Sequence, residues 1–149
     1  MKIFCDTNII MEYLQQRSQC ETVEMLLVYA FKEKHSLYIS FGSFYTITYL
    51  VERYLKAESL SKEERMDKLR AILNGILNTF GFAYQTSYSI KTGINDLLFS
   101  DLEDSYQGHI AEDSNCDVLI TINEKHFSSF AEKSSVEVLT PQQFIEKYV

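Results

Sequence analysis

Hydrophobic positions along the chain predict short buried strands that alternate with longer amphipathic helices. The clearest strand is expected at Asp117–Thr121, which is short, mostly apolar and β-branched, as in a strand buried on both faces. A second apolar run predicts the first strand at Lys2–Cys5. Three further short strands are expected at Leu37–Ser40, Phe80–Tyr84 and Val136–Leu139.

Helical periodicity fills the segments between these strands. Ser61 and Glu64 form a capping-box pattern that opens one helix, and Pro141 occupies a favoured first helical position. Apolar residues three and four apart predict helices at Ile9–Gln16, Cys20–Lys34, a run from Ile47 to Leu55, a run from Leu69 to Leu77, Ser87–Leu98, Leu102–Ser114 and a segment from Pro141 onward. Because parallel strands need crossover connections, this alternation predicts an α/β fold with a parallel sheet.

Composition adds a domain count and a cellular setting. The 149 residues are 46% hydrophobic and contain one proline, so we expect a single domain over residues 1–149 with a sizeable core. Cys5, Cys20 and Cys116 show no zinc-ligand spacing, which favours a reducing, cytoplasmic setting with Cys5 and Cys116 as small buried residues. No apolar stretch is long enough to span a bilayer, and we expect no membrane partner.

The net charge of the chain limits the ways in which it can bind nucleic acid. Fourteen basic residues against 21 acidic ones give a net charge of −7. Proteins that bind nucleic acid through their overall field usually carry a basic face. Binding to nucleic acid would therefore require a local basic rim, or a partner that supplies one.

Candidate chemistry begins at Asp6, where the first strand ends. Carboxyl ends of strands in open parallel sheets are where ligands bind. A second interpretation is available, because Asp6, Thr7 and Asn8 are residue types that cap a following helix. Considered alone, the pattern favours the capping role.

A second acidic stretch changes that balance. Asp101, Glu103 and Asp104 stand where a helix is predicted to begin, and acidic residues there also stabilise a helix through its dipole. If the strands Lys2–Cys5 and Asp117–Thr121 are neighbours, Asp6, Asp104 and the polar segment around Asn123 share one crevice. Clustered carboxylates repel one another and suit a hard ion such as Mg²⁺ or Mn²⁺, which can support phosphodiester cleavage.

At these residues the chain resembles the PIN domain, the nuclease domain of toxins in type II toxin–antitoxin pairs. The matching stretches are Phe4–Ile10, Asp101–Gln107 and Cys116–Phe127, followed by an ending at Val138–Phe144. The resemblance covers essentially the whole chain. It implies a three-layer fold, with a central parallel sheet of about five strands flanked by helices, and metal-dependent cleavage of single-stranded RNA.

The resemblance also implies roles for individual residues. Asp6 and Asp104 match metal-binding carboxylates, and we expect Asn123 to join them as a catalytic residue that orients substrate or water. Supporting residues are expected at Thr7, Asn8, Asp101, Glu103, Thr121 and His126.

Two departures from the family pattern favour an alternative function. Thr46 falls where the family commonly has a glutamate, and Asn123 and His126 stand where aspartate is common. Each lost carboxylate weakens Mg²⁺ binding, whereas His126 is either a ligand that favours Mn²⁺ or a polar surface residue. The alternative is a catalytically weak or inactive PIN-like domain that binds protein or RNA.

Partners follow from the resemblance. An antitoxin protein and a homodimer are implied, with the antitoxin in a groove between early helices. Tyr45, Tyr49 and Tyr54 either line such a surface or belong to the core, and the core is favoured. A flavodoxin-like or phosphate-binding domain is disfavoured, because no glycine-rich loop follows any strand.

Overall fold

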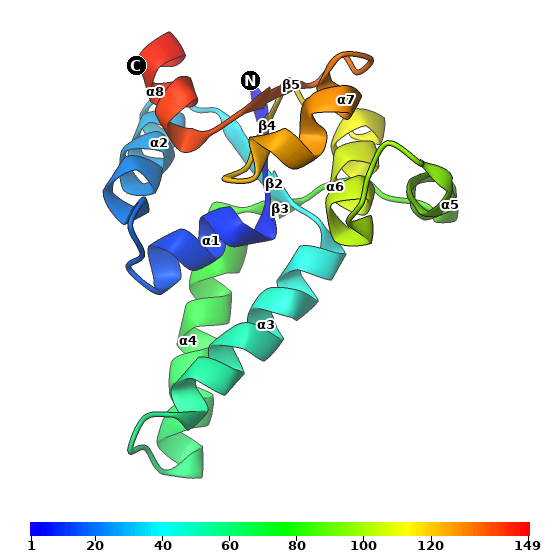
Figure 1. Cartoon of the computed structure of the whole chain (residues 1–149). Coiled ribbons are helices and arrows are strands. Elements are labelled where there is room, and N and C mark those ends of the chain that lie inside the picture. The colour runs from blue at the N-terminus through cyan, green and yellow to red at the C-terminus, as the bar shows by residue number, and fades with distance from the viewer.

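Five parallel strands form one sheet in the computed structural model of the 149 residues (Figure 1). The spatial order is β3-β2-β1-β4-β5, so the chain winds from β1 to one edge and then returns to build the other. The strands are β1 at Lys2–Cys5, β2 at Ser36–Ile39, β3 at Gly81–Phe82, β4 at Val118–Ile120 and β5 at Glu137–Leu139. This arrangement confirms the predicted α/β fold with a five-stranded parallel sheet.

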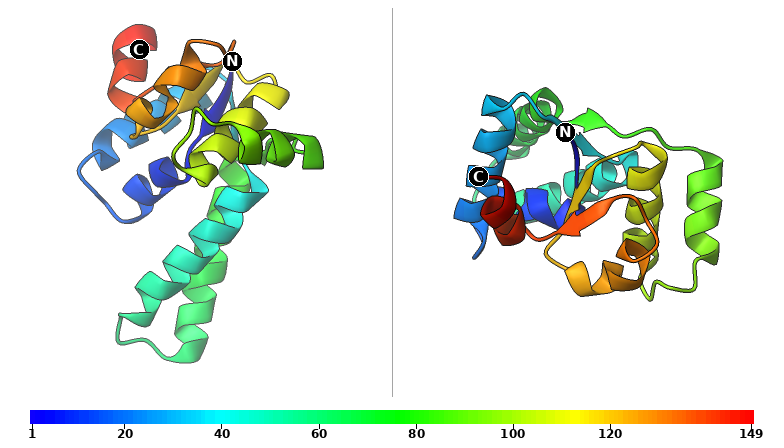
Figure 2. Two further views of the ribbon diagram at one scale, coloured as in Figure 1. Left: turned by 45° about the vertical axis from the view of Figure 1, so that its right-hand side comes forward. Right: turned by 90° about the horizontal axis from the view of Figure 1, so that it is seen from above.

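Helices cover both faces of the sheet. Seen from above, α2 and α8 lie on one side of the strands and α5 and α6 on the other (Figure 2). The helices are α1 at Thr7–Leu14, α2 at Cys20–Lys32, α3 at Phe41–Lys56, α4 at Lys62–Thr79, α5 at Ser87–Asn95, α6 at Leu102–Asp113, α7 at Ser128–Ala131 and α8 at Pro141–Tyr148, with a 3₁₀ turn η1 at Glu124–Phe127.

Strand alternation divides the interior into two apolar clusters. Ile3 and Cys5 of β1 point into the larger cluster, which also contains buried residues of α1, α2, α3, α4 and α8. Phe4 points the other way, into a cluster with residues of α6, η1 and α7. All three side chains are fully buried, as expected for a strand between two helical layers. The result is the three-layer architecture that the resemblance implied.

Several predicted boundaries are wrong. Helix α1 begins at Thr7 rather than Ile9, and α5 ends at Asn95 rather than Leu98. Strand β3 has two residues instead of five. The elements η1 and α7 were not predicted, since their segment carries polar residues without helical periodicity. The capping box of α4 is confirmed: the Ser61 amide donates to Glu64 Oε2 and the Glu64 amide to Ser61 Oγ.

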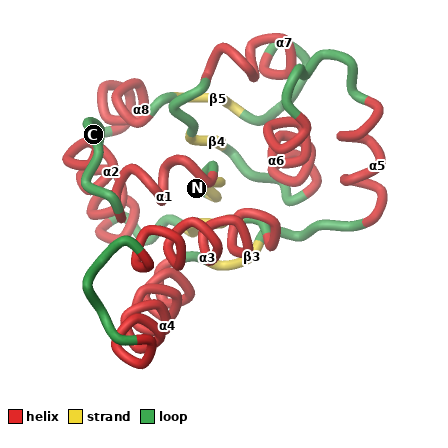
Figure 3. Tube along the Cα trace, turned by 60° about the horizontal axis from the view of Figure 1, so that its bottom comes forward, coloured by secondary structure: helices red, strands yellow, loops and turns green.

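Helices α3 and α4 pack side by side as a hairpin that extends away from the sheet (Figures 1 and 3). Along α3, Ile47 and Val51 are buried, but Tyr45, Tyr49 and Tyr54 are 69%, 62% and 51% exposed. The preferred core assignment of these three tyrosines is therefore wrong, because more than half of each side chain is exposed.

The cysteines behave as small side chains. Cys5 and Cys116 are buried, as predicted, and all three thiols are free. None of the helices combines the length and the apolar character needed to cross a membrane.

Candidate functional site

The candidate site lies where the two central strands β1 and β4 end. The chain continues from β1 toward β2 and β3 on one side, while β4 and β5 lie on the other, so this edge is a switch point of the sheet. The Asp6 amide donates to the Ile120 carbonyl at 3.0 Å, and Thr121 Oγ1 donates to Asp6 Oδ2 at 2.9 Å. Ligand sites of open α/β sheets occur at such points.

Asp6 occupies the N-cap position of α1 without acting as a side-chain cap. Its backbone is extended, with φ −60° and ψ 150°, but its carboxylate accepts no hydrogen bond from the first turn. Both oxygens are used elsewhere: Oδ1 accepts from Gln107 Nε2 at 2.8 Å and Oδ2 from Thr121. The side-chain capping interpretation of Asp6 is therefore wrong, and neither Thr7 nor Asn8 caps this helix.

Burial makes the charge of Asp6 costly. The residue is 1% exposed and no cationic side chain pairs with it. Burial, the largest cause, raises the pKa of Asp6 to about 6. Repulsion from Asp104 and Glu103 acts in the same direction, whereas the hydrogen bonds from Thr121 and Gln107 lower this pKa. A cation would stabilise the charged form of Asp6, because this carboxylate is buried, has no cationic partner and lies near two other carboxylates.

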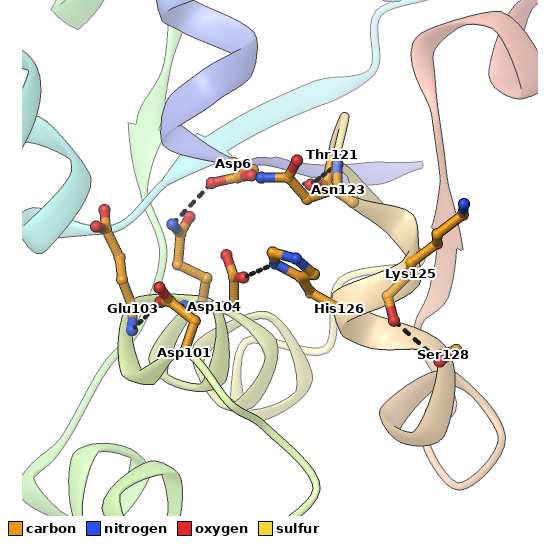
Figure 4. Close-up of polar contacts among 10 residues, drawn as sticks. Asp6, Asp101, Glu103, Asp104, Thr121, Asn123, Lys125, His126 and Ser128 are labelled. Atoms are coloured by element: carbon orange, nitrogen blue, oxygen red, sulfur yellow. Dashed lines mark hydrogen bonds and ion pairs between the residues drawn. The ribbon is translucent and has the colours of Figure 1, made fainter.

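Asp104 opens α6 and faces the same site (Figure 4). It is 6% exposed, and its Oδ2 lies 2.7 Å from Nδ1 of His126. Burial raises the pKa of Asp104, while the hydrogen bond with His126 lowers it. The His126 side chain remains half-exposed. His126 was expected to be either a metal ligand or a polar surface residue. Neither role describes its position fully, because its imidazole is hydrogen-bonded to Asp104, a candidate metal ligand.

Asp101 and Glu103 have different surroundings. Asp101 Oδ1 caps α6 by accepting from the amides of Glu103 at 2.8 Å and Asp104 at 3.1 Å. The exposed Glu103 reaches back toward β1, where its Oε1 accepts from Thr7 Oγ1 at 3.1 Å. The structure thus gives Asp101 a capping role and brings Glu103 beside the Asp6 segment.

Of the remaining candidate residues, one contacts the Asp6 carboxylate and the others only lie near it. Thr121 is fully buried and holds both the Asp6 carboxylate and, through its Oγ1, the amide of Asn123 at 3.0 Å. The Asn123 side chain points toward Asp6 in Figure 4. Asn8 is half-buried at the start of α1 and takes no part in this hydrogen-bond network.

A pocket of about 290 Å³ adjoins the site. Its lining includes Thr46 together with Ser43, Glu103 and Gln107, so α3 and α6 face each other across it. Thr46 thus shares this pocket with Glu103 without adding a carboxylate of its own. Glu52, on α3, pairs instead with Lys56 at 3.5 Å.

These residues fit a divalent ion with few protein ligands. No group of three or more Asp, Glu, His or Cys side chains converges closely enough to form a complete cage. Asp6 and Asp104 are nonetheless two buried carboxylates that repel each other, with an amide side chain beside them. Mg²⁺ commonly binds through one or two carboxylates and keeps several waters, which agrees with this donor set.

Two buried residues of the site, Gln107 and Ser43, were not predicted. Gln107 contacts Asp6 and Thr7, and Ser43 Oγ donates to Gln107 Oε1 at 3.3 Å. The available signal was spacing: Gln107 follows Asp104 by three positions and Glu103 by four, which places all three on one helical face.

Comparisons with known proteins bear on the fold of the chain. No protein-family model matches the chain. The chain is 26% identical over 152 residues to Ribonuclease VapC1 of Aquifex aeolicus, with 99% of this chain and 95% of that protein covered. The crystal structure of VapBC2 from Rickettsia felis bound to a DNA fragment from their promoter matches with a TM-score of 0.68 and 16% identity, over 94% of this chain and 98% of the other. These likenesses confirm the PIN-like fold and the resemblance found in the sequence.

Proposed function

We propose that this chain, with the fold and motif order of PIN-domain toxins, is a metal-dependent endoribonuclease that cleaves single-stranded RNA and acts as the toxin of a toxin–antitoxin pair. The observation that carries the proposal is the buried Asp6 carboxylate at the switch point of the sheet, which pairs with no cationic side chain and is close enough to Asp104 for the two charges to repel. Support comes from the similar protein named a ribonuclease.

Asp6 and Asp104 would hold the Mg²⁺ or Mn²⁺ ion. Such an ion, when bound, supplies an activated water and offsets the charge that develops on the phosphodiester. Thr121 fixes one oxygen of Asp6 by a hydrogen bond from its hydroxyl. The Asn123 amide points toward Asp6, and we expect it to orient the RNA phosphate or the attacking water. Glu103 faces the adjoining pocket, in which substrate can approach the carboxylates.

A bound cation would also reduce the electrostatic repulsion between this acidic chain and RNA. With a net charge of −7, the protein repels RNA at long range. Neutralising Asp6 and Asp104 removes the repulsion nearest to the scissile phosphate. RNA cleavage should therefore depend on the metal for binding as well as for chemistry.

An apolar groove between α1, α3 and α4 is the proposed antitoxin site. It has a volume of about 360 Å³ and is lined mainly by hydrophobic residues, among them Leu14, Tyr54, Ala71 and Ile72. A second groove of about 280 Å³ continues between α1, α2 and α4. Grooves of this kind bind the apolar face of an amphipathic helix. The exposed Tyr45 and Tyr49 are proposed to pair two copies in a homodimer.

The RNase proposal is tested by cleavage of a labelled single-stranded RNA with Mn²⁺ or Mg²⁺ present. Wild-type protein should cut, and both EDTA and the substitution Asp6→Asn should abolish cutting. Asp67→Asn on the exposed face of α4 is a matched control that should keep full activity. Cleavage that persists in Asp6→Asn would contradict the proposal.

A PIN-like binding module without catalysis is the second candidate. It is favoured by Thr46 in the adjoining pocket and by His126 on the Asp104 carboxylate. Absence of both RNA cleavage and Mn²⁺ binding at millimolar Mn²⁺ would support this function over the first.

A further inference from the structure

Gln107 is a neutral residue buried among acidic ones. It lies on α6, one turn beyond Glu103 and Asp104, and is 2% exposed. Its Nε2 donates to Asp6 Oδ1 at 2.8 Å and to Thr7 Oγ1 at 3.3 Å. Its Oε1 accepts from Ser43 Oγ at 3.3 Å. The Gln107 side chain therefore connects α6 to the carboxyl end of β1 and to the first turn of α3.

The hydrogen count fixes the direction of this amide. Nε2 carries two hydrogens, and each has one acceptor, namely Asp6 and Thr7. A flipped amide would place Oε1 against the Asp6 carboxylate and its NH₂ against Ser43. Ser43 Oγ also accepts from Ser40 Oγ at 2.9 Å, so its own hydrogen is free to go to Gln107. The network has one satisfied orientation of the amide.

Thr7 extends the same network to a second carboxylate. Because Thr7 Oγ1 accepts from Gln107, its single hydrogen remains for Glu103 Oε1 at 3.1 Å or Ser43 Oγ at 2.9 Å. A carboxylate is the stronger acceptor of the two. Gln107 is thus linked directly to Asp6 and through one hydroxyl to Glu103.

We propose that Gln107 is a positioning residue that holds the Asp6 carboxylate in the orientation required for metal binding. The inference rests on the proposed function. Gln107 fixes Oδ1 and Thr121 fixes Oδ2, so the plane of the carboxylate is set from two sides. Each of these oxygens accepts one side-chain hydrogen bond and has the capacity for a second interaction, which leaves an electron pair for a cation.

The neutrality of the amide is what suits this role. A lysine or arginine at position 107 would pair with Asp6 and displace a metal ion. A carboxylate there would add to the repulsion from Asp104 and Glu103. An amide orients Asp6 while leaving its charge available. Side chains that hold metal ligands in this way commonly change metal affinity when they are replaced.

The test is Mn²⁺ affinity measured by titration calorimetry on Gln107→Met, which keeps the length of the side chain and removes both donors. We expect the dissociation constant to rise about tenfold or more, within the range for residues that hold metal ligands. At saturating Mn²⁺, turnover should fall because Asp6 is held less well, while the KM for RNA should be nearly unchanged because the cation on which RNA binding depends is bound. Gln142→Met, at an exposed glutamine of α8, should match the wild type.

Two further variants separate positioning from folding. Ser43→Ala removes the contact on the amide oxygen but leaves the donors to Asp6, so it should weaken Mn²⁺ binding less than Gln107→Met does. Gln107→Asn keeps the amide but shortens the side chain, and should lose affinity while remaining folded. Urea unfolding in EDTA verifies the fold of each variant, and if Gln107→Met is unfolded the comparison of Gln107→Asn with wild type decides.

The outcomes distinguish this inference from the proposed function. Wild-type affinity in the folded Gln107 variants, with binding lost in Asp6→Asn, would overturn the positioning role and leave the nuclease intact. A wild-type protein that neither binds Mn²⁺ nor cleaves RNA would overturn both. Loss of affinity in the Gln107 variants, with Gln142→Met unaffected, supports the positioning role.

Discussion

The imidazole of His126 and the carboxylate of Asp104 form a hydrogen-bonded pair, with Nδ1 2.7 Å from Oδ2. His126 belongs to η1, just beyond β4, and Asp104 to the first turn of α6 (Figure 4). The pair therefore connects the two elements that border Asp6. It also engages Oδ2 of a proposed metal ligand, so His126 competes with a cation for that oxygen.

Replacing His126 tests whether it competes with a metal or binds one. In His126→Ala we expect Mn²⁺ to bind at least as tightly as in wild type, because Oδ2 of Asp104 is then free. Without metal, the free energy of unfolding should fall by about 1 kcal/mol or less, since the imidazole is half-exposed. Calorimetric titration measures the first effect and urea unfolding the second. Weaker Mn²⁺ binding would instead make His126 a ligand.

Asp6→Asn should stabilise the metal-free protein at neutral pH. The pKa of Asp6 is about 6 in the fold against an ordinary value of 3.8, so the folded state binds the extra proton between these values. The Asp6 contribution to stability is thus fully present below pH 3.8 and is lost as pH rises through about 6. The asparagine never carries the charge, and we expect its advantage to reach about 3 kcal/mol above that range.

Urea unfolding in EDTA at about pH 7.5 and at about pH 3.5 measures this dependence. The two proteins should be similarly stable at the lower pH and differ at the higher one. An Asp6→Asn variant that is less stable than wild type at the higher pH would show that the Asp6 charge is favourable without metal. Added Mn²⁺ should stabilise wild type alone.

Thr46→Glu would place a carboxylate in the pocket beside Glu103 and Gln107. Because affinity for hard cations follows the number of charged ligands, Mg²⁺ should bind roughly tenfold more tightly. The metal-free variant should be less stable than wild type, since a further negative charge joins the cluster. Mg²⁺ titration measures the affinity, with Thr46→Gln as the neutral control. Equal affinity in Thr46→Glu and Thr46→Gln would show that position 46 lies out of reach of the ion.

Ala71→Arg should weaken antitoxin binding by at least about tenfold, because a guanidinium would be buried against apolar side chains. Ala71 is exposed and lines the groove between α1, α3 and α4, so the fold should tolerate the change. The measurement is the affinity for the product of the adjacent reading frame, with RNA cleavage of the free variant as the control for folding. Unchanged affinity would exclude this groove as the antitoxin site.

The identity of strands and helices followed from the sequence because their residues are either clearly buried or clearly exposed, which gives a clear hydrophobic pattern. Ile3, Phe4 and Cys5 are all buried, and an apolar run of that kind has few other uses in a protein of this size. Helix ends were harder to predict. Gln16, Lys34 and Asn115 adopt positive φ at 48°, 56° and 52° just beyond α1, α2 and α6, so no glycine marked these ends.

The positions of the two carboxylates were predictable, but not all of their hydrogen-bond partners. Asp6 follows from the end of β1, and Asp104 from the acidic start of α6 together with the resemblance. Gln107 and Ser43 act through hydrogen bonds between α3 and α6, which local spacing in one segment does not determine. The exposure of Tyr45 and Tyr49 depends on how far the α3–α4 hairpin extends beyond the sheet, which is also a tertiary property.

The central claim is that Asp6 and Asp104 together hold a divalent ion at the edge of the sheet. Anomalous diffraction from a crystal soaked in Mn²⁺ tests it most directly. We predict one anomalous peak in contact with carboxylate oxygens of both residues, absent from crystals of Asp6→Asn. A site without such a peak, or a peak that contacts neither carboxylate, would contradict the account.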